Sequence, residues 1–290
     1  MAWLKSLIKV SRPGFWPTHL WFFLLPLGQR EMFGSVGFWL GCVYVCFPLG
    51  LLLYGWNDLF DRETDRLNPR KDSWLFGARL DDDGLRRLPL WIAATQLPFA
   101  IVFTALVGAK ALLWFAAMAA ANAVYNWPKL GWKNWPVLDL VNQVAYLLVF
   151  VLASWVCAVP QLSAPAMVFS ALFAMQSHLF GQVMDVDEDR AAGRRTTASI
   201  IGVRASKLLV VALLAVEAHI AWTYFRGAFV EAFLLAGALF FLADALAGFR
   251  GRPYPAWFSK LFFVGWNLVV VASMHFVWRY GVFVLDRHGA

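Results

Sequence analysis

Long hydrophobic segments recur along the whole chain and are separated by short polar stretches. Each is close to the ~20 residues that an α-helix needs to cross the hydrocarbon core of a bilayer. About nine segments meet this description, at residues 15–33, 36–57, 88–108, 110–127, 136–158, 164–184, 207–226, 229–248 and 260–284. The pattern predicts an all-α, polytopic membrane protein with about nine transmembrane helices.

The composition supports this prediction, since 61% of the 290 residues are hydrophobic and only 15% are charged. Such usage lies far outside that of soluble globular proteins. Because no linker or low-complexity stretch divides the sequence, we expect a single transmembrane domain over residues 1–290.

The basic residues predict how the chain is oriented. Most of the 25 Lys and Arg residues lie in the N-terminal segment and in every second loop, and cytoplasmic loops of membrane proteins carry such an excess. We therefore expect a cytoplasmic N-terminus and an external C-terminus, in a bacterial or archaeal cytoplasmic membrane. The net charge of +7 then reflects topology. Nucleic acid is not an expected partner, because the basic residues share their loops with acidic clusters.

The most informative polar stretch follows the second hydrophobic segment and contains Asn57, Asp58, Asp61 and Asp65. On a helix, the spacing i, i+3, i+7 places the three aspartates on one face. Ion pairs with Arg62 and Arg66 are the alternative interpretation. Exposed pairs are worth only about 0–1 kcal/mol, however, and give little reason to gather three acids. The cluster therefore predicts metal binding, with the Asn57 amide as a neutral ligand.

A second acidic cluster follows the sixth hydrophobic segment. There Asp185 and Asp189 are spaced i, i+4, while Asp187 and Glu188 would point elsewhere on a helix. Each cluster precedes a basic loop, and this weak internal repeat predicts two helical halves that face each other across a central cavity. Carboxylates of both halves would then share a divalent metal site. Hard oxygen ligands favour Mg²⁺, usually bound together with substrate phosphates.

Basic side chains near the two clusters are candidates for binding phosphate oxygens, Arg through its planar fork and Lys as a point charge. The candidate phosphate-binding residues are Arg12, Arg66, Tyr125, Lys129, Lys133, Arg194 and Arg195. The spacing of Tyr125 and Lys129 puts a phenol and an ammonium group on related faces of a helix. Alternatively, Lys129 extends toward the membrane surface and Arg12 serves only as a topology signal.

Three polar residues inside hydrophobic segments are candidates for supporting roles. His178 lies one turn before Gln182 and is either catalytic or a hydrogen-bonded core histidine. Gln182 could coordinate a metal through its carbonyl oxygen. Asp244 lies inside a membrane segment, where carboxylates are rare and usually functional.

Together these residues resemble the UbiA superfamily of intramembrane prenyltransferases. Asn57-Asp58-x-x-Asp61-x-x-x-Asp65 matches the first signature of that family at every defined position, and Asp185-x-x-x-Asp189 matches the second. Tyr125-x-x-x-Lys129 matches its Tyr/Lys pair after the fourth helix. The likeness covers nearly the whole chain, and it implies a helical fold around a central cavity with a cytoplasmic active site.

Two departures from the family pattern bear on the branch. Residues 67–72, Leu-Asn-Pro-Arg-Lys-Asp, replace the Arg-Pro…Ser-Gly-Arg segment of many members that prenylate aromatic acids, and Gln182 stands where many members have another Asp. Residues 11–16, 53–58 and 67–72 are similar to the lycopene elongase branch, which attaches a C5 unit to a carotenoid. The 4-hydroxybenzoate and naphthoate branches remain open.

The resemblance implies a prenyltransferase that binds a prenyl diphosphate with two Mg²⁺ ions, which Mn²⁺ can replace. Asp185 and Lys129 would be catalytic, with Asp185 or another carboxylate taking a proton after a hydrophobic acceptor attacks the carbocation. Aromatic-acid prenylation in quinone biosynthesis and an intramembrane terpene cyclase are the alternatives. A cation transporter fits less well, because it would place its acids at the middle of the membrane.

Overall fold

The computed structural model describes residues 2–68 and 70–284. Pro69, which belongs to the predicted branch-specific segment 67–72, lies outside them. The longer helices are α3 (Val36–Cys46), α7 (Asp82–Val107), α8 (Lys110–Asn126), α10 (Leu147–Val156), α11 (Ala164–Met184), α14 (Val203–Tyr224), α15 (Ala228–Leu246) and α16 (Ala256–Arg279). The shorter α-helices are α1 (Ala2–Val10), α2 (Trp16–Leu24), α4 (Pro48–Gly50), α5 (Trp56–Phe60), α6 (Arg62–Leu67), α9 (Leu138–Val141), α12 (Val186–Ala191) and α13 (Thr197–Ile201). Tighter or wider turns form η1 (Pro13–Phe15), η2 (Leu25–Leu27), η3 (Leu51–Gly55), η4 (Trp132–Asn134) and η5 (Asn142–Tyr146). The predicted all-α class is confirmed.

Six helical stretches of the described residues are long and apolar enough to cross a membrane. They are Val36–Phe60, Asp82–Val107, Leu138–Val156, Val203–Tyr224, Ala228–Leu246 and Ala256–Arg279. The expected count of nine is therefore not confirmed. Helix α2 has only 9 residues before η2, and α8 has 17. Helix α11 has 21 residues, but polar side chains such as Gln176 and His178 lower its hydropathy.

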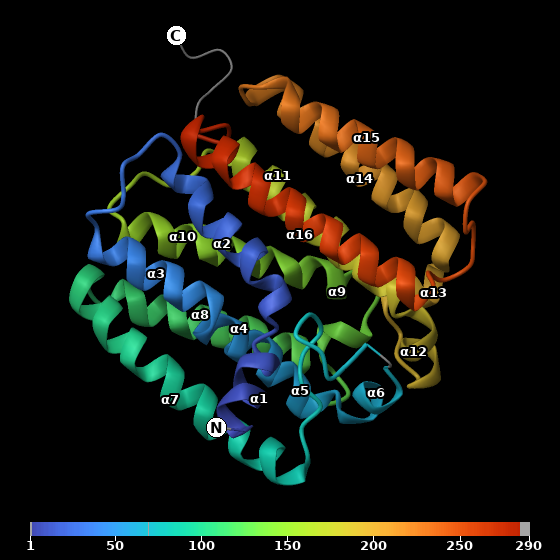
Figure 1. Cartoon of the computed structure of the whole chain (residues 1–290), viewed down its shortest axis with the longest axis horizontal. Coiled ribbons are helices and arrows are strands. Elements are labelled where there is room, and N and C mark those ends of the chain that lie inside the picture. The colour runs from blue at the N-terminus through green and yellow to red at the C-terminus, as the bar shows by residue number, and fades with distance from the viewer. Residues whose placement is uncertain (1, 69, 285–290) are drawn as a thin grey trace.

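The helices form one bundle, in which α15 lies at one edge and α7 at the other (Figure 1). Helices α14 and α15 pack against each other as a hairpin, and α14 also packs on α11. Helix α16 packs along α2, while α7 and α8 pair at the opposite edge. Helix α6 contacts α12, although more than a hundred residues separate them in the chain. The two acidic clusters thus meet at one end of the bundle.

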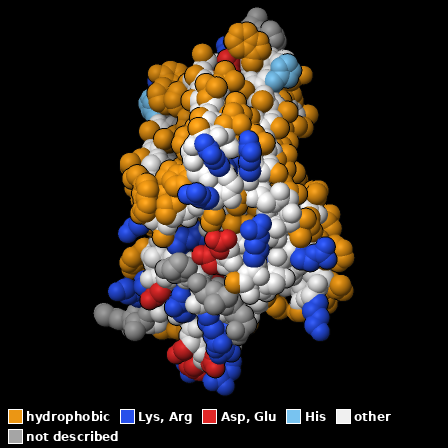
Figure 2. All heavy atoms as spheres, turned by 90° about the vertical axis from the view of Figure 1, so that its right-hand side faces the viewer, with side chains coloured by type: hydrophobic (Ala, Val, Ile, Leu, Met, Phe, Trp, Pro, Cys, Tyr) orange, Lys and Arg blue, Asp and Glu red, His pale blue; other side chains and the backbone are white. Residues whose placement is uncertain are grey.

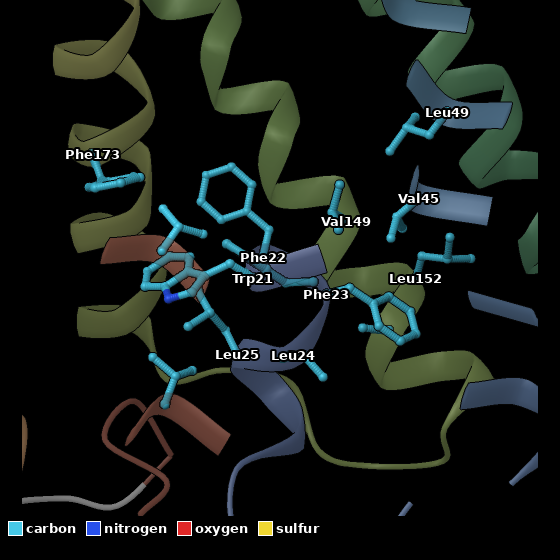
Figure 3. Packing of buried hydrophobic residues seen from close by; sticks show 14 of the residues in the cluster. Trp21, Phe22, Phe23, Leu24, Leu25, Val45, Leu49, Val149, Leu152 and Phe173 are labelled. Atoms are coloured by element: carbon cyan, nitrogen blue, oxygen red, sulfur yellow. The ribbon is translucent and has the colours of Figure 1, made fainter. Parts of the chain in front are cut away.

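The core is centred on α2, which is short but almost wholly enclosed (Figure 3). Its aromatic side chains Trp21, Phe22 and Phe23 are buried, together with Val45 of α3 and Val149 of α10. Between membrane helices, such side chains stabilise the packing through van der Waals contacts. This packing fixes α2 and the segment before it against the neighbouring helices.

Interruptions of helical geometry lie next to the acidic motif. The π-helical turn η3 directly precedes α5, and the 3₁₀ turn η5 lies in the segment of α9 and α10. Such irregular turns often occur at functional sites. Gly50 allows the chain to approach Ser11 closely, because a Cβ atom there would lie 2.5 Å from the Ser11 carbonyl oxygen. This contact brings the neighbouring Arg12 toward the acidic motif.

Candidate active site

A cavity of about 740 Å³ lies among α2, α8, α11, α15 and α16. Its polar end is lined by Arg12, Asn57, Asp61, Asp65, Asn68, Arg70, Lys71, Lys133, Asp185, Glu188, Asp189 and Arg194. Its apolar walls include Phe22, Phe173, Phe180, Phe233, Phe241, Phe262, Phe263 and Trp266. Figure 2 views the molecule from the right-hand side of Figure 1 and shows most of the visible Lys, Arg, Asp and Glu side chains in the middle and lower parts of this face, below a mainly hydrophobic upper part.

Asp61 of the first acidic cluster lies on one wall of the cavity, where it contacts two cations. It is 4% exposed, forms an ion pair with Lys133 and another with Arg194, and accepts a hydrogen bond of 2.6 Å from Asn57 Nδ2. Burial by itself would raise the pKa of this carboxyl, but the Arg194 and Lys133 cations outweigh burial and lower the pKa below its usual value. Asp61 is therefore held as a carboxylate.

Asp58 departs from the expected shared face. Helix α5 ends at Phe60 and a new helix begins at Arg62, so the three aspartates are not on one continuous helix. Asp58 is buried away from the cavity lining, and its Oδ1 contacts Arg12 at 3.2 Å and Lys71 at 2.7 Å. In this structure Asp58 contacts two cations and does not line the cavity, and its binding of a metal stays a prediction.

Lys71 is a site residue that the sequence analysis did not identify. Its ammonium group also contacts Asp65 Oδ2 at 2.8 Å, and its side chain is 3% exposed. Burial and the nearby Asp58 carboxylate raise the pKa of Asp65, while Lys71 opposes that effect. A lysine six residues after the motif in a basic loop gave no signal by which to select it.

The second acidic pair forms the opposite wall. Asp185 lies between α11 and α12, where it pairs with Arg70 and accepts a hydrogen bond of 3.3 Å from Asn68 Nδ2. Asp189 is buried on α12, and burial raises its pKa to about 6 despite Arg194. Glu188 also lines the cavity, which corrects the expectation that it points elsewhere.

Arg194 connects the two walls. Its guanidinium group pairs with Asp61 on one side and lies 3.7 Å from Asp189 on the other. Arg190 and Gly193 form the turn that returns the chain to this position, and Gly193 has a positive φ of 69° that suits glycine. A cation between carboxylates offsets the repulsion that bringing the two acidic clusters together would cause.

Lys133, and not Lys129, reaches the cavity. The predicted helical spacing of Tyr125 and Lys129 ends at Asn126, where α8 stops, and Lys129 has a positive φ of 64°. Lys129 and Arg195 are exposed and line a separate hollow of about 620 Å³, which shares Lys133 and Arg194 with the main cavity. Lys129 therefore lies outside the main cavity, and its catalytic role stays a prediction.

Arg66 is also placed differently from the expectation. It lies in the last turn of α6, is exposed, and is absent from the cavity lining. Arg12, Tyr125, Lys133 and Arg194 remain as the predicted phosphate-binding residues that line the cavity.

Gln182 lines the cavity, and both ends of its side-chain amide take part in a buried hydrogen-bond network. Its Nε2 donates to Asp139 Oδ2 at 2.7 Å, and its Oε1 accepts a hydrogen bond of 3.1 Å from the Ala198 amide. Asp139, which the sequence analysis did not single out as a site residue, also accepts from the Thr197 amide at 2.6 Å and from its hydroxyl. This network fixes the loop that carries Arg194.

His178 faces the cavity beside Tyr125, with 3.2 Å between His178 Nε2 and the Tyr125 hydroxyl. Asp244, by contrast, lies outside the cavity lining. It pairs with the buried Lys207 at 2.7 Å and accepts a hydrogen bond of 2.5 Å from the Tyr254 hydroxyl. Its contacts are those of a structural residue.

The donor set suits a divalent metal that arrives with a phosphate ligand. Within the described residues, no group of three His, Cys, Asp or Glu is close enough to hold a metal by itself. The carboxylates that line the cavity are Asp61, Asp65, Asp185, Glu188 and Asp189, divided between two walls. Mg²⁺ is usually held by one or two carboxylates, with water and substrate phosphates as its other ligands.

Comparisons with known proteins agree with this geometry. The family model described as "UbiA prenyltransferase family" matches residues 15–278. A protein named lycopene elongase/hydratase from Haloarcula japonica is 32% identical over 69% of this chain and 68% of its own. One of the same name from Corynebacterium glutamicum is 27% identical over 91% of this chain and 95% of its own.

A solved structure shares the fold. It is a UbiA homolog from Archaeoglobus fulgidus bound to DMAPP and Mg²⁺, with a TM-score of 0.70 and 20% identity over 94% of this chain and 98% of that chain. The resemblance seen in the two acidic motifs is thus confirmed. The chain belongs to the UbiA prenyltransferase family.

Proposed function

We propose that this prenyltransferase moves a prenyl group from a prenyl diphosphate to an acyclic hydrophobic polyene inside the membrane, with a carotenoid such as lycopene as the acceptor. One observation carries the proposal: a single cavity joins a charged end to a long aromatic-lined body. The charged end suits a diphosphate. The body suits a hydrocarbon chain that enters from the lipid.

The proposal includes Mg²⁺, with one ion at each acidic wall and Mn²⁺ as a substitute. Asp61 and Asp65, with Asn57, would serve the first wall, and Asp185 with Asp189 the second. Bound Mg²⁺ neutralises the charge that develops on a diphosphate as it leaves. The UbiA homolog from Archaeoglobus fulgidus, which is bound to DMAPP and Mg²⁺, supports the use of Mg²⁺.

The protein's own cations would bind and orient the diphosphate. Lys133 and Arg194 point into the charged end and are already paired with Asp61, so a bound diphosphate would share them with that carboxylate. Arg12 lies on the same side, with its guanidinium carbon 4.6 Å from the centre of the Tyr54 ring. Preorganised cations of this kind act most strongly where water is excluded.

The aromatic walls would protect the reacting carbon. Breaking the allylic C–O bond leaves a carbocation, which attracts the negative faces of aromatic rings. Phe173, Phe262 and Trp266 lie among the rings of the wall, with 5.7 Å between the centroids of Phe173 and Trp266. These side chains exclude water, so the acceptor's double bond competes with little hydrolysis.

The acceptor class is supported by the relatives and by the lining. Proteins named lycopene elongase/hydratase match most of this chain. The body of the cavity is mainly apolar, and its cations are already paired with carboxylates at the diphosphate end. Selection among hydrocarbons by cavity shape would be weak, at about 1–3 kcal/mol per methylene.

The same proposal covers the setting of the enzyme. The whole chain, residues 1–290, would form one domain in a bacterial or archaeal membrane, with the charged end of the cavity on the cytoplasmic side. The gathering of Lys and Arg side chains toward the lower part of the molecule in Figure 2 supports this orientation.

The experiment is a side-by-side assay of the purified protein in lipid vesicles with radiolabelled dimethylallyl diphosphate. Lycopene, 4-hydroxybenzoate and a dihydroxynaphthoate are offered separately, and longer prenyl diphosphates are tested in parallel. We expect label to enter a lycopene product. Efficient labelling of 4-hydroxybenzoate with lycopene inert would overturn the acceptor class, and release of a cyclic hydrocarbon without any acceptor would indicate a cyclase.

A further inference from the structure

Three polar side chains from distant parts of the chain form a hydrogen-bonded row at the edge of the apolar part of the cavity. They are His19 of α2, Tyr54 of η3 and Tyr146 of η5, and all three line the cavity. His19 Nε2 lies 3.2 Å from the Tyr54 hydroxyl, which lies 3.5 Å from the Tyr146 hydroxyl. None of them belongs to the acidic motifs or to the predicted phosphate-binding set.

The direction of the hydrogen bonds follows from the anchored end of the row. His19 Nδ1 lies 3.0 Å from the carbonyl oxygen of Val45, and a carbonyl oxygen can only accept. A neutral His19 therefore carries its hydrogen on Nδ1, which leaves Nε2 as an acceptor. Tyr54 then donates its hydroxyl hydrogen to Nε2, and the Tyr54 oxygen accepts from Tyr146. The Tyr146 oxygen keeps unshared electron pairs, with which it can accept a hydrogen bond from a water molecule.

Gln143 connects the row with the charged end of the cavity. It precedes Tyr146 by three residues in η5, and side chains so spaced in a 3₁₀ turn lie one above the other. Gln143 Nε2 donates to the Asp139 carbonyl oxygen at 3.0 Å, which leaves the Gln143 amide oxygen to accept a hydrogen bond from water. A water inside a protein needs about 2–4 polar partners. Gln143 and Tyr146, which both line the cavity, offer two on one face.

The row lies beside the expected position of the reacting carbon. Arg12, a proposed diphosphate contact, stacks on the Tyr54 ring at 4.6 Å. Tyr146 contacts Phe22 of the apolar wall, with 5.9 Å between ring centroids, and Phe22 contacts Phe173 at 6.0 Å. The hydroxyl groups thus occupy the boundary between the charged end and the hydrocarbon body, where transfer from the diphosphate to the acceptor would take place.

We propose that Tyr146 holds a water molecule that captures the cation left on the acceptor after prenyl transfer, and that Tyr54 and His19 take up the proton, which makes a tertiary alcohol the product. This rests on the proposed function, because the transfer itself generates the cation. Relatives named lycopene elongase/hydratase carry both activities in their names. Neither the names nor the acidic motifs indicate which residues would bind the water.

Atoms and charge balance in this step. The allylic C–O bond breaks with its electrons on the diphosphate, and the acceptor double bond forms a C–C bond to the allylic carbon, leaving a tertiary cation. The water oxygen forms a C–O bond to that cation and becomes a protonated alcohol. The extra proton goes to the Tyr146 oxygen, the Tyr146 hydrogen moves to Tyr54, and the Tyr54 hydrogen moves to His19 Nε2. A protonated alcohol is a far stronger acid than an imidazolium, so a neutral imidazole accepts the proton.

A water held at one point lets addition compete with the loss of a C–H proton from the same cation. His19 is 1% exposed and the aromatic walls exclude bulk water, so the water bound at Tyr146 is the one beside the cation. Without it, the cation would lose a neighbouring C–H proton to the diphosphate and give an alkene. The ratio of alcohol to alkene therefore reports whether the row holds the water.

The first test measures this ratio with dimethylallyl diphosphate and lycopene in H₂¹⁸O, by mass spectrometry of the prenylated products. The wild type should form mainly a tertiary alcohol that carries ¹⁸O. Tyr146→Phe keeps the ring that contacts Phe22 but removes the hydroxyl, and the ratio of alcohol to alkene should fall by about 10-fold or more. Tyr54→Phe keeps the ring on which Arg12 stacks, breaks the row, and should lower the ratio as well.

Tyr44→Phe is the matched control, because Tyr44 is a buried tyrosine that donates to Gln96 and does not line the cavity. The control should keep the wild-type ratio. Because both products come from the same cation, a variant that is merely slower keeps the ratio too. Binding of dimethylallyl diphosphate by each variant verifies that it is folded.

The second test observes the row without any turnover. In ¹⁵N-histidine-labelled protein, the signal of His19 is assigned by its loss in His19→Asn. We expect a hydrogen on Nδ1 and none on Nε2, and a shift of the Nε2 resonance in Tyr54→Phe but not in Tyr44→Phe.

Several outcomes would overturn the proposal. These are an alkene as the main wild-type product, an unchanged ratio of alcohol to alkene in Tyr146→Phe or Tyr54→Phe, or a hydrogen on Nε2 of His19. Failure of the proposed function looks different, because the wild type would then form no prenylated lycopene at all. If only the present inference fails, the wild type still prenylates lycopene, but the row does not control the addition of water.

Discussion

At the scale of single residues, the polar end of the cavity is a set of carboxylates balanced by cations. Asp61 forms ion pairs with Lys133 and Arg194, Asp65 with Lys71, and Asp185 with Arg70. Each cation reduces the repulsion between neighbouring acids, and several of them also line the space for a diphosphate. Because of these pairs, the two acidic walls can lie close together without protonation of all their carboxylates.

Asp61→Asn and Asp189→Asn should each lower the rate of prenyl transfer by about 100-fold or more, because each removes a charge at the proposed metal and diphosphate site. The amide keeps the shape of the side chain, and thermal unfolding in detergent micelles verifies that each variant is folded, since Asp61→Asn removes the carboxylate that pairs with Lys133 and Arg194. The matched control is Asp187→Asn, which changes an exposed residue of the same helix outside the cavity lining. Turnover at the wild-type rate in either site variant, at saturating Mg²⁺, would contradict the two-wall site.

Lys133→Met should weaken the enzyme far more than Lys129→Met. Lys133 is buried at the cavity and paired with Asp61, whereas Lys129 is exposed and lines only the outer hollow. We expect the KM for prenyl diphosphate to rise and kcat to fall by about 100-fold or more for Lys133→Met. Steady-state kinetics of the two variants measure this, and equal losses would show that Lys129 also reaches the diphosphate.

At the scale of elements, breaks in helices bring functional groups to the cavity. The interruption between α5 and α6 separates Asp58 from the cavity, and the end of α8 at Asn126 lets η4 present Lys133. Elements behind the walls are fixed by buried polar contacts. One of these joins Lys207 of α14 to Asp244 of α15 and to Tyr254 in the loop before α16.

Asp244→Ala should destabilise the protein by about 3–5 kcal/mol, because it leaves Lys207, which is 0% exposed, as an unpaired buried charge. The double variant Lys207→Met with Asp244→Ala should regain part of this loss. Thermal unfolding in detergent micelles measures both. As a control, Asp83→Ala breaks an exposed pair with Arg87 and should cost at most about 1 kcal/mol. A double variant less stable than Asp244→Ala would contradict this account.

At the scale of the whole molecule, the site exists only where two distant parts of the chain meet. Asp61 and Asp65 precede α7, Asp185 and Asp189 follow α11, and Arg194 bridges the two sets. The aromatic body of the cavity comes from still other helices, including α15 and α16. Charge and hydrocarbon environments are therefore adjacent in one cavity although they are encoded far apart.

Activity should require a divalent cation because the two acidic walls need a small, hard ion to share with the diphosphate. Excess EDTA should abolish both prenyl transfer and tight binding of a prenyl diphosphate. Mg²⁺ or Mn²⁺ should restore both, and Ca²⁺ should do so poorly because it prefers longer bonds and more ligands. Calorimetric binding and product assays with each metal test this, and full activity in EDTA would rule it out.

The hydrophobic and acidic patterns of the sequence determined the helical membrane fold and the identity of most cavity-lining acids. Asp61, Asp65, Asp185 and Asp189 were predicted from spacing, because within a short stretch of chain the spacing limits which side chains can meet. Helical spacing no longer relates side chains beyond the end of a helix. The predicted positions of Lys129, beyond the end of α8, and of Asp58, before the interruption after α5, therefore differ from those in the structure.

Only the tertiary structure decided which residues from separate helices meet. Lys71 pairs with Asp58 and Arg70 with Asp185, while Asp139 accepts hydrogen bonds from Gln182 and Thr197. Hydrogen bonds also link His19, Tyr54 and Tyr146, which lie on three elements. No local periodicity encodes these contacts, because they depend on how helices distant in sequence pack. Buried polar groups must find hydrogen-bond partners in that packing, and the partners they find define the chemistry of the site.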